Sequence, residues 1–214
     1  MELRARPRRL GWITADFSSA TLTLLPLAVG IDLLGDWVAG YALHLPLYLD
    51  SVGTVLVAAL CGPLPAAATG AASDLIAGAI LSPTNAPFAI SSVAIGLVAG
   101  MLARWGVFSR TRPPLAQARF WAKVILAGAL VGLVSATVST PIAAYLFNGL
   151  TGGGTDILVA LFEAHGLSIL ASTWLQSLAV DPYDKVITFV LVALVLKGLP
   201  GRLTGLFPGS QKLD

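Results

Sequence analysis

Carboxylate and amide side chains interrupt long apolar stretches of this sequence, and their chemistry is that of ligand binding. Asp32 and Asp36 are one helical turn apart, and Asp74 follows a run rich in Ala and Gly. Ionisable groups are costly in an apolar medium, and within membrane segments they usually mark a functional site. The candidate substrate-binding residues are Asp32, Asp36, Asp50, Ser51, Asp74, Asn85, Ser92 and Thr140.

These acceptors indicate a ligand that carries positive charge or many hydrogen-bond donors, since no Lys or Arg within the apolar stretches is expected beside them. Structural roles stay open. Asp36 and Asp50 could be solvated helix ends, the hydroxyls could bond their own backbone, and Asp184 with Lys185 could form a charge pair at the membrane interface.

Catalytic motifs are missing from the sequence. It has no nucleophile elbow, no phosphate-binding loop and no dinucleotide-binding turn, and its two histidines, His44 and His165, have no metal-site spacing. Its single cysteine, Cys61, excludes an internal disulfide. We therefore expect no enzymatic activity, no catalytic residue, no metal and no cofactor.

The composition is that of a membrane protein. Of 214 residues, 56% are hydrophobic and 11% are charged, and the mean hydropathy is +0.84, whereas soluble domains are about 25% charged. Apart from Lys185, the basic residues form three clusters, which indicate membrane topology rather than nucleic-acid binding. They are Arg4, Arg6, Arg8 and Arg9; Arg104, Arg110, Arg112, Arg119 and Lys123; and Lys197, Arg202 and Lys212.

Apolar segments of nearly the ~20 residues needed for a spanning helix predict an all-α bundle of about six transmembrane helices in one domain, 1–214. The segments are about 17–40, 48–62, 64–82, 87–104, 120–147 and 184–200. Gly62, Pro63 and Pro65 predict a tight reversal between the second and third. Small residues four apart, such as Gly96/Gly100 and Gly128/Gly132, predict close helix packing or contact with a partner subunit.

The apolar stretch 156–178 is ambiguous, because it contains Glu163, His165 and Gln176. If it does not span, all three basic clusters lie on the cytoplasmic side, as the positive-inside rule requires. We therefore predict that 149–183 is an outer or re-entrant segment, that 1–16 is a cytoplasmic tail, and that both termini are cytoplasmic. The candidate polar residues then share the outer half of the membrane, which favours an outward-facing pocket over a channel.

Several short sequences are similar to those of a known membrane family. They include Leu45-Pro46-Leu47-Tyr48-Leu49-Asp50-Ser51-Val52-Gly53-Thr54, Ser73-Asp74-Leu75-Ile76, Pro83-Thr84-Asn85-Ala86-Pro87-Phe88 and Gly96-Leu97-Val98-Ala99-Gly100. With Asp184-Lys185 and Lys197-Gly198-Leu199-Pro200, they resemble the substrate-binding subunits (S components) of energy-coupling factor (ECF) transporters over about residues 20–205.

The resemblance implies a six-helix bundle in the plasma membrane that captures a vitamin-like micronutrient from outside. It also implies partners, a transmembrane coupling subunit and ATP-binding subunits, and no nucleic acid. The chain departs from the family in two places. Its first span reads Ala20, Leu24, Ala28 instead of the family's Ala-x-x-x-Ala stripe, and it lacks the Met-His start of the nickel and cobalt members. A membrane sensor or assembly module without transport activity is the alternative function.

Overall fold

The computed structural model describes residues 17–109, 114–207 and 209, and helices are the only regular elements in these ranges. This confirms the all-α prediction. The predicted tail 1–16 and the basic residues Arg110, Arg112 and Lys212 lie outside the described residues. In chain order the elements are α2 (Ser19–Asp36), the π-helical η1 (Trp37–Ala42), α3 (Val52–Cys61), α4 (Pro63–Ile80), the 3₁₀ helix η2 (Pro83–Phe88), α5 (Ala89–Arg104), α6 (Pro114–Phe147), α7 (Asp156–Ala164), α8 (Ile169–Gly198) and α9 (Gly201–Thr204).

Local chemistry explains where the helices start and stop. Ser18 caps α2 by accepting a hydrogen bond from the Thr21 amide at 3.1 Å. Gly62 has a φ of +97° and ends α3, and Pro63 at once begins α4, so the predicted reversal is present. Ser168 likewise caps α8 by accepting from the Ala171 amide.

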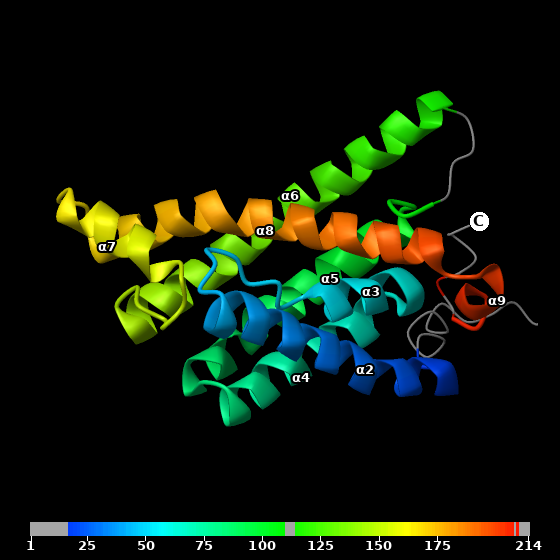
Figure 1. Cartoon of the computed structure of the whole chain (residues 1–214), viewed down its shortest axis with the longest axis horizontal. Helices are drawn as coiled ribbons and strands as arrows, with labels where there is room; N and C mark the ends of the chain where they lie inside the picture. The colour runs from blue at the N-terminus through cyan, green and yellow to red at the C-terminus, as the bar shows by residue number, and fades with distance from the viewer. Residues whose placement is uncertain (1–16, 110–113, 208, 210–214) are drawn as a thin grey trace, which may run out of the picture.

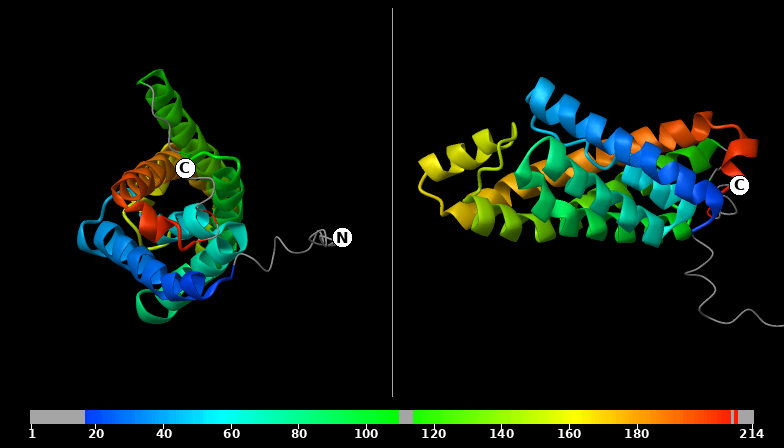
Figure 2. Two further views of the ribbon diagram at one scale, coloured as in Figure 1. Left: turned by 90° about the vertical axis from the view of Figure 1, so that its right-hand side faces the viewer. Right: turned by 90° about the horizontal axis from the view of Figure 1, so that it is seen from below.

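Helices α2, α3, α4, α5, α6 and α8 alternate in direction along the long axis of the molecule (Figures 1 and 2). Glycines allow their closest approaches. A Cβ on Gly132 would lie 2.3 Å from the Cα of Pro182 in α8, and one on Gly100 would lie 2.3 Å from the Cα of Pro63 in α4. The small-residue positions at Gly100 and Gly132 therefore pack helices within the bundle.

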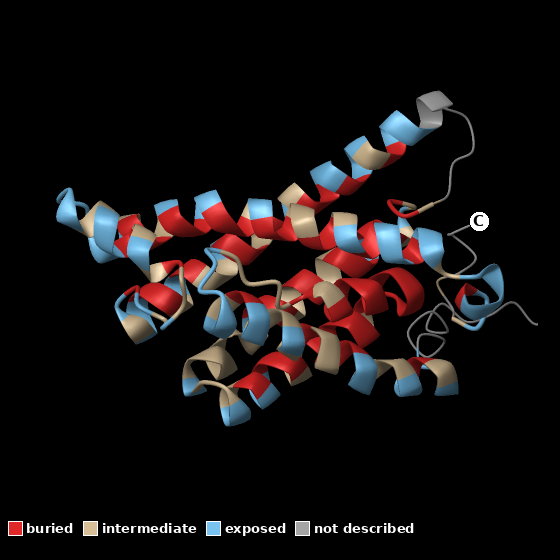
Figure 3. Ribbon diagram, in the orientation of Figure 1, coloured by how far each residue is buried: buried red, intermediate tan, exposed pale blue. Residues whose placement is uncertain are grey.

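Many large apolar side chains are exposed, including those of Leu34, Ile90 and Leu126. Figure 3 shows that exposed positions recur along the helices of the bundle. Patches of this kind are rare on soluble monomers. Three segments are long and apolar enough to cross a membrane, Ser19–Ala42, Pro83–Arg104 and Gln117–Phe147. The membrane character expected from the composition is thus supported by these helices.

Two predicted segment boundaries are wrong. The segment expected at 48–62 is helical only from Val52, and its 10 residues extend about 15 Å, half the ~30 Å thickness of a bilayer core. The break expected near residue 184 is absent, because α8 is continuous from Ile169 to Gly198. Asp184 and Lys185 do not end the helix, since each finds a partner inside the bundle.

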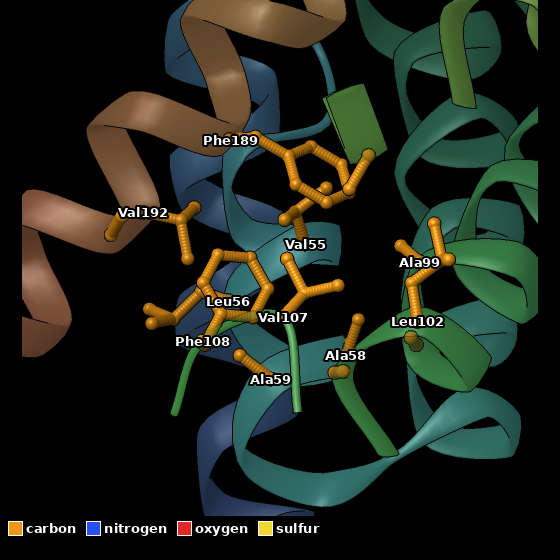
Figure 4. Close-up of a cluster of buried hydrophobic side chains, with 14 of the residues drawn as sticks. Val55, Leu56, Ala58, Ala59, Ala99, Leu102, Val107, Phe108, Phe189 and Val192 are labelled. Atoms are coloured by element: carbon orange, nitrogen blue, oxygen red, sulfur yellow. The ribbon is translucent and has the colours of Figure 1, made fainter. Parts of the chain in front are cut away.

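A hydrophobic core fills the half of the bundle around α3 (Figure 4). Val55 and Leu56 of α3 meet Phe189 and Val192 of α8 in this core, and Phe108, just after α5, stacks on Phe189 with ring centroids 5.5 Å apart. This apolar half seals the end of the bundle where α5 and α8 finish.

Candidate functional site

A cavity occupies the other half of the bundle, towards the end that carries α7. The volume open to the centres of water-sized molecules is about 110 Å³, many times the roughly 10–15 Å³ that one ordered water needs. It therefore has room for a small organic molecule. Its polar lining comprises Asp36, Tyr41, Tyr48, Asp50, Asp74, Asn85, Ser91, Ser92, Ser135, Ser139, Thr151, Thr155, Gln176, Ser177, Asp181 and Lys185.

Lys185 is the charged centre of the cavity wall, and it is only 1% exposed. Its Nζ donates to Asp50 Oδ1 and to Asp184 Oδ2, both at 2.7 Å. Because an ammonium group needs such partners to be buried, these two carboxylates explain how α8 tolerates a lysine in its middle. The third N–H of the ammonium has no acceptor among the described residues.

The segment 43–51, between η1 and α3, closes one side of the cavity. Asp184 Oδ1 accepts hydrogen bonds from the Tyr48 and Leu49 amides, each at 3.0 Å. These bonds hold Leu49 at a φ of +50°, which is unfavourable for a bulky side chain. Gly35 makes the close contact with α2 possible, since a Cβ there would lie 2.0 Å from the Leu49 carbonyl oxygen. The result is a fixed position for Asp50 next to Lys185.

A second segment, the glycine-rich stretch 149–155, closes the end of the cavity. Asp156 at the start of α7 accepts from the amides of Thr151 at 3.0 Å and Gly152 at 2.7 Å. Gly154 packs against segment 43–51, where a Cβ would lie 2.6 Å from the His44 and Leu45 carbonyl oxygens.

Tyr48 links the two segments to α8. The Tyr48 hydroxyl donates a hydrogen bond to Thr155 Oγ1 at 3.3 Å and accepts one from Gln176 Nε2 at 3.1 Å. Both covering segments are therefore bonded to the same tyrosine.

Five of the predicted site residues line this cavity, namely Asp36, Asp50, Asp74, Asn85 and Ser92. The Asn85 amide donates to Asp36 Oδ2 at 2.9 Å, which joins η2 to the end of α2. The Ser92 hydroxyl donates to Asp74 Oδ2 at 2.5 Å, which joins α5 to α4. Sequence segments far apart are thus brought together around one space.

Asp32 is absent from the cavity lining and has a packing role instead. Its carboxylate lies at the start of α3, where it accepts from the Gly53 amide at 2.7 Å and from the Thr54 hydroxyl at 2.7 Å. It also accepts from the Ser73 hydroxyl of α4 at 2.9 Å. Asp32 therefore caps α3 from another helix and ties α2, α3 and α4 together.

The other two predicted residues, Ser51 and Thr140, are buried away from the cavity lining. Neither hydroxyl has a hydrogen-bond partner among the described residues.

Sequence analysis missed the contribution of α8. Ser177, Asp181 and Lys185 all line the cavity, and their spacing of four residues places them on one helix face. That spacing was visible in the sequence. The expectation that the carboxylates have no basic residue beside them is wrong, because Lys185 contacts Asp50 directly. The incorrect boundary at residue 184 concealed this, since it separated Lys185 from Ser177 and Asp181.

Binding is the chemistry that this arrangement can perform, with many hydrogen-bonding groups on rigid helices. Among the described residues, no group of three or more His, Cys, Asp or Glu side chains is placed to hold a metal ion. No protein-family model, curated protein or solved structure matches this chain. The cavity and its contacts therefore carry the functional inference.

Proposed function

We propose that this chain is the substrate-binding membrane subunit of an ECF-type transporter, which captures a small, polar, vitamin-like micronutrient from outside the cell. In this proposal α2, α3 with segment 43–51, α4, α5, α6 and α8 make six passes of the plasma membrane. The cavity faces outward, and both termini are cytoplasmic. A coupling subunit and ATP-binding subunits supply the energy, and the chain itself catalyses no reaction.

The observation that carries the proposal is the division of the bundle into a polar cavity at one end and an apolar core at the other. A channel needs polar groups along its whole length, whereas here Val55, Phe108 and Phe189 fill the path beyond the cavity. A polar chamber that ends at an apolar core suits a protein that binds its substrate and depends on a partner to release it.

The basic residues support the proposed orientation. Arg104 ends α5, Lys197 is in the last turn of α8, and Arg202 is in α9. These helix ends lie at the end of the bundle opposite α7 (Figure 1). By the positive-inside rule this end is cytoplasmic, so the cavity opens towards the outside.

The surface that meets the coupling subunit differs from the stripe that the family resemblance implies. Ala28 is fully buried, and a Cβ on Gly53 of α3 would lie 2.0 Å from its carbonyl oxygen. Ala28 is therefore occupied by α3. In this proposal the partner contacts the exposed apolar face of α2, which includes Leu22, Leu27 and Leu34.

The test is affinity purification of the full chain from its native membrane in a mild detergent, followed by mass spectrometry of subunits and of bound small molecules. Recovery of a coupling subunit with two ATPases, and ATP-dependent uptake of the bound molecule by the reconstituted complex, would support the proposal. Recovery with a kinase or another regulator, and without ATPases, would favour the sensor alternative. A chain recovered intact without either ATPase or bound molecule would refute the transport proposal.

A further inference from the structure

The cavity lining contains more acidic than basic side chains. Four carboxylates line it, those of Asp36, Asp50, Asp74 and Asp181, and Lys185 is the basic residue in the same lining. Lys185 is already paired with Asp50 and with Asp184. The same lysine also attracts Asp36, Asp74 and Asp181 at longer range, so a single described cation is shared among five carboxylates.

The partners of these three carboxylates are neutral. Asp36 accepts from the Asn85 amide at 2.9 Å, Asp74 from the Ser92 hydroxyl at 2.5 Å, and Asp181 from the Ser139 hydroxyl at 3.3 Å. Each neutral donor satisfies part of one carboxylate but supplies no opposing charge. Because uncompensated charges inside a membrane protein are costly, a bound cation would be strongly favoured at this site.

Two serine hydroxyls of the lining are available for further hydrogen bonds. Ser91 and Ser177 line it and are 4% and 3% exposed, and neither hydroxyl has a hydrogen-bond partner among the described residues. Polar groups buried to this extent are normally satisfied. They therefore remain free for a ligand that carries hydrogen-bonding groups of its own.

Aromatic rings complete the lining. Tyr41, Tyr48 and Phe88 border the cavity, and Phe88 is held in place by stacking on Phe147, with ring centroids 6.0 Å apart. Ring faces attract cations, and organic cations in particular bind among aromatic side chains and carboxylates. The ammonium charge of Lys185 would repel a cationic centre placed beside it. Its remaining N–H can instead donate to a hydrogen-bond acceptor elsewhere on the ligand.

We infer that the ligand is a small organic cation that also carries a hydrogen-bond acceptor, bound by Asp36, Asp74 and Asp181 among the rings of Tyr41, Tyr48 and Phe88. This inference rests on the proposed function, because it names the substrate class of the same cavity. An anion would meet surplus negative charge despite Lys185, since that lysine already contacts two carboxylates.

The test is a thermal-stability screen of the full chain in lipid nanodiscs against water-soluble metabolites sorted into cations, neutral molecules and anions. Matched pairs such as choline and its uncharged isostere 3,3-dimethylbutan-1-ol separate charge from shape. The stabilising compounds are expected to be cations, and they should bind at least about ten-fold more tightly than their neutral isosteres. Stabilisation mainly by neutral or anionic compounds would overturn the inference and leave the proposed function intact. A wild-type chain that binds no compound of any class would overturn both.

Variants localise the effect. Asp181→Asn keeps the shape of the side chain and removes its charge, so it should weaken the best cation about ten-fold or more. Glu163→Gln is the matched control, because it removes one negative charge from α7, outside the cavity lining, and its affinity should equal that of the wild type. Equal weakening by both variants, or by neither, would contradict the assignment of the cationic site.

Discussion

Replacing Lys185 with Met is expected to destabilise the protein more than any other single change in a charged side chain of α8. The substitution keeps a long apolar stem and removes the ammonium that donates to Asp50 and Asp184 at 2.7 Å each. Asp184 is 0% exposed, whereas Asp50 is 27% exposed. The fully buried carboxylate therefore suffers most when its cation is removed.

The magnitude follows from these exposures. Loss of the charged bond to Asp184 costs about 2–3 kcal/mol, and loss of the bond to the more exposed Asp50 costs about 1 kcal/mol. The total of about 3–4 kcal/mol agrees with the roughly 3–5 kcal/mol found when one partner of a buried pair is removed. The free energy of unfolding would be measured by titration with a denaturing detergent in mixed micelles, followed by tryptophan fluorescence.

A double variant tests the cause. Asp184→Asn keeps an oxygen for the Tyr48 and Leu49 amides, so Asp184→Asn with Lys185→Met removes both charges and retains those two bonds. The double variant should be more stable than Lys185→Met alone, with a coupling energy of about 2–3 kcal/mol. Lys197→Met is the control in the same helix. The Lys197 Nζ lies 4.2 Å from the Trp121 ring centroid, and loss of this contact should lower the free energy of unfolding by about 1 kcal/mol or less. Additive effects of the two single changes, or equal costs at Lys185 and Lys197, would refute the reasoning.

Three further substitutions test how the cavity is built. Gly53→Ala should lower the free energy of unfolding by about 2 kcal/mol or more, because the new Cβ would lie 2.0 Å from the Ala28 carbonyl oxygen. Gly30→Ala is the control, because a Cβ at Gly30 meets nothing within 4 Å, and it should be neutral or stabilising by up to about 1 kcal/mol. Thermal unfolding measures both variants, and equal effects of the two changes would exclude close packing of α2 on α3. Asp32→Asn should cost about 2 kcal/mol, since its new amide would face the donors of α3 and α4; an unchanged melting temperature would contradict its role as a cap. Gly154→Ala should speed proteolytic cleavage within 43–51 several-fold, because it separates the two covering segments. Gly153→Ala is the control, since the nearest atom to its new Cβ would be 3.8 Å away, and it should leave the cleavage rate unchanged. Identical cleavage of the two variants would show that these segments do not support each other.

Periodicity and composition predicted much of the fold, because they depend on local chemistry. The reversal at Gly62 and Pro63 needs only a positive φ and a helix-starting proline, and both are properties of the residues themselves. The length of α8 was not predictable in this way. Its Asp184 and Lys185 resemble a helix end in the sequence, and their partners Tyr48, Leu49 and Asp50 are more than a hundred residues away.

The same limit explains which site residues were predicted. Asp36, Asp74, Asn85 and Ser92 were identified by their depth relative to expected spans whose boundaries were nearly correct, whereas Asp50 lines the cavity although the start of its expected helix was wrong. Asp32 has a similar depth, but the close approach at Gly53 turns α3 towards it and makes it a cap. Which face of a helix lines a cavity depends on the neighbouring helix, and a single sequence does not contain that information.

The placement of polar groups also explains how a membrane protein can contain so hydrophilic a chamber and remain folded. Each covering segment is held by a carboxylate that accepts backbone amides, Asp184 for segment 43–51 and Asp156 for segment 149–155. Of these two, only Asp184 contacts the cavity lysine. A ligand that engages Lys185 therefore contacts the same network that fixes segment 43–51, whereas segment 149–155 has a separate carboxylate anchor and meets segment 43–51 through Tyr48 and the packing of Gly154. If one segment loosens to admit substrate, this difference predicts that it is 149–155, because its carboxylate anchor, Asp156, lies outside the cavity lining.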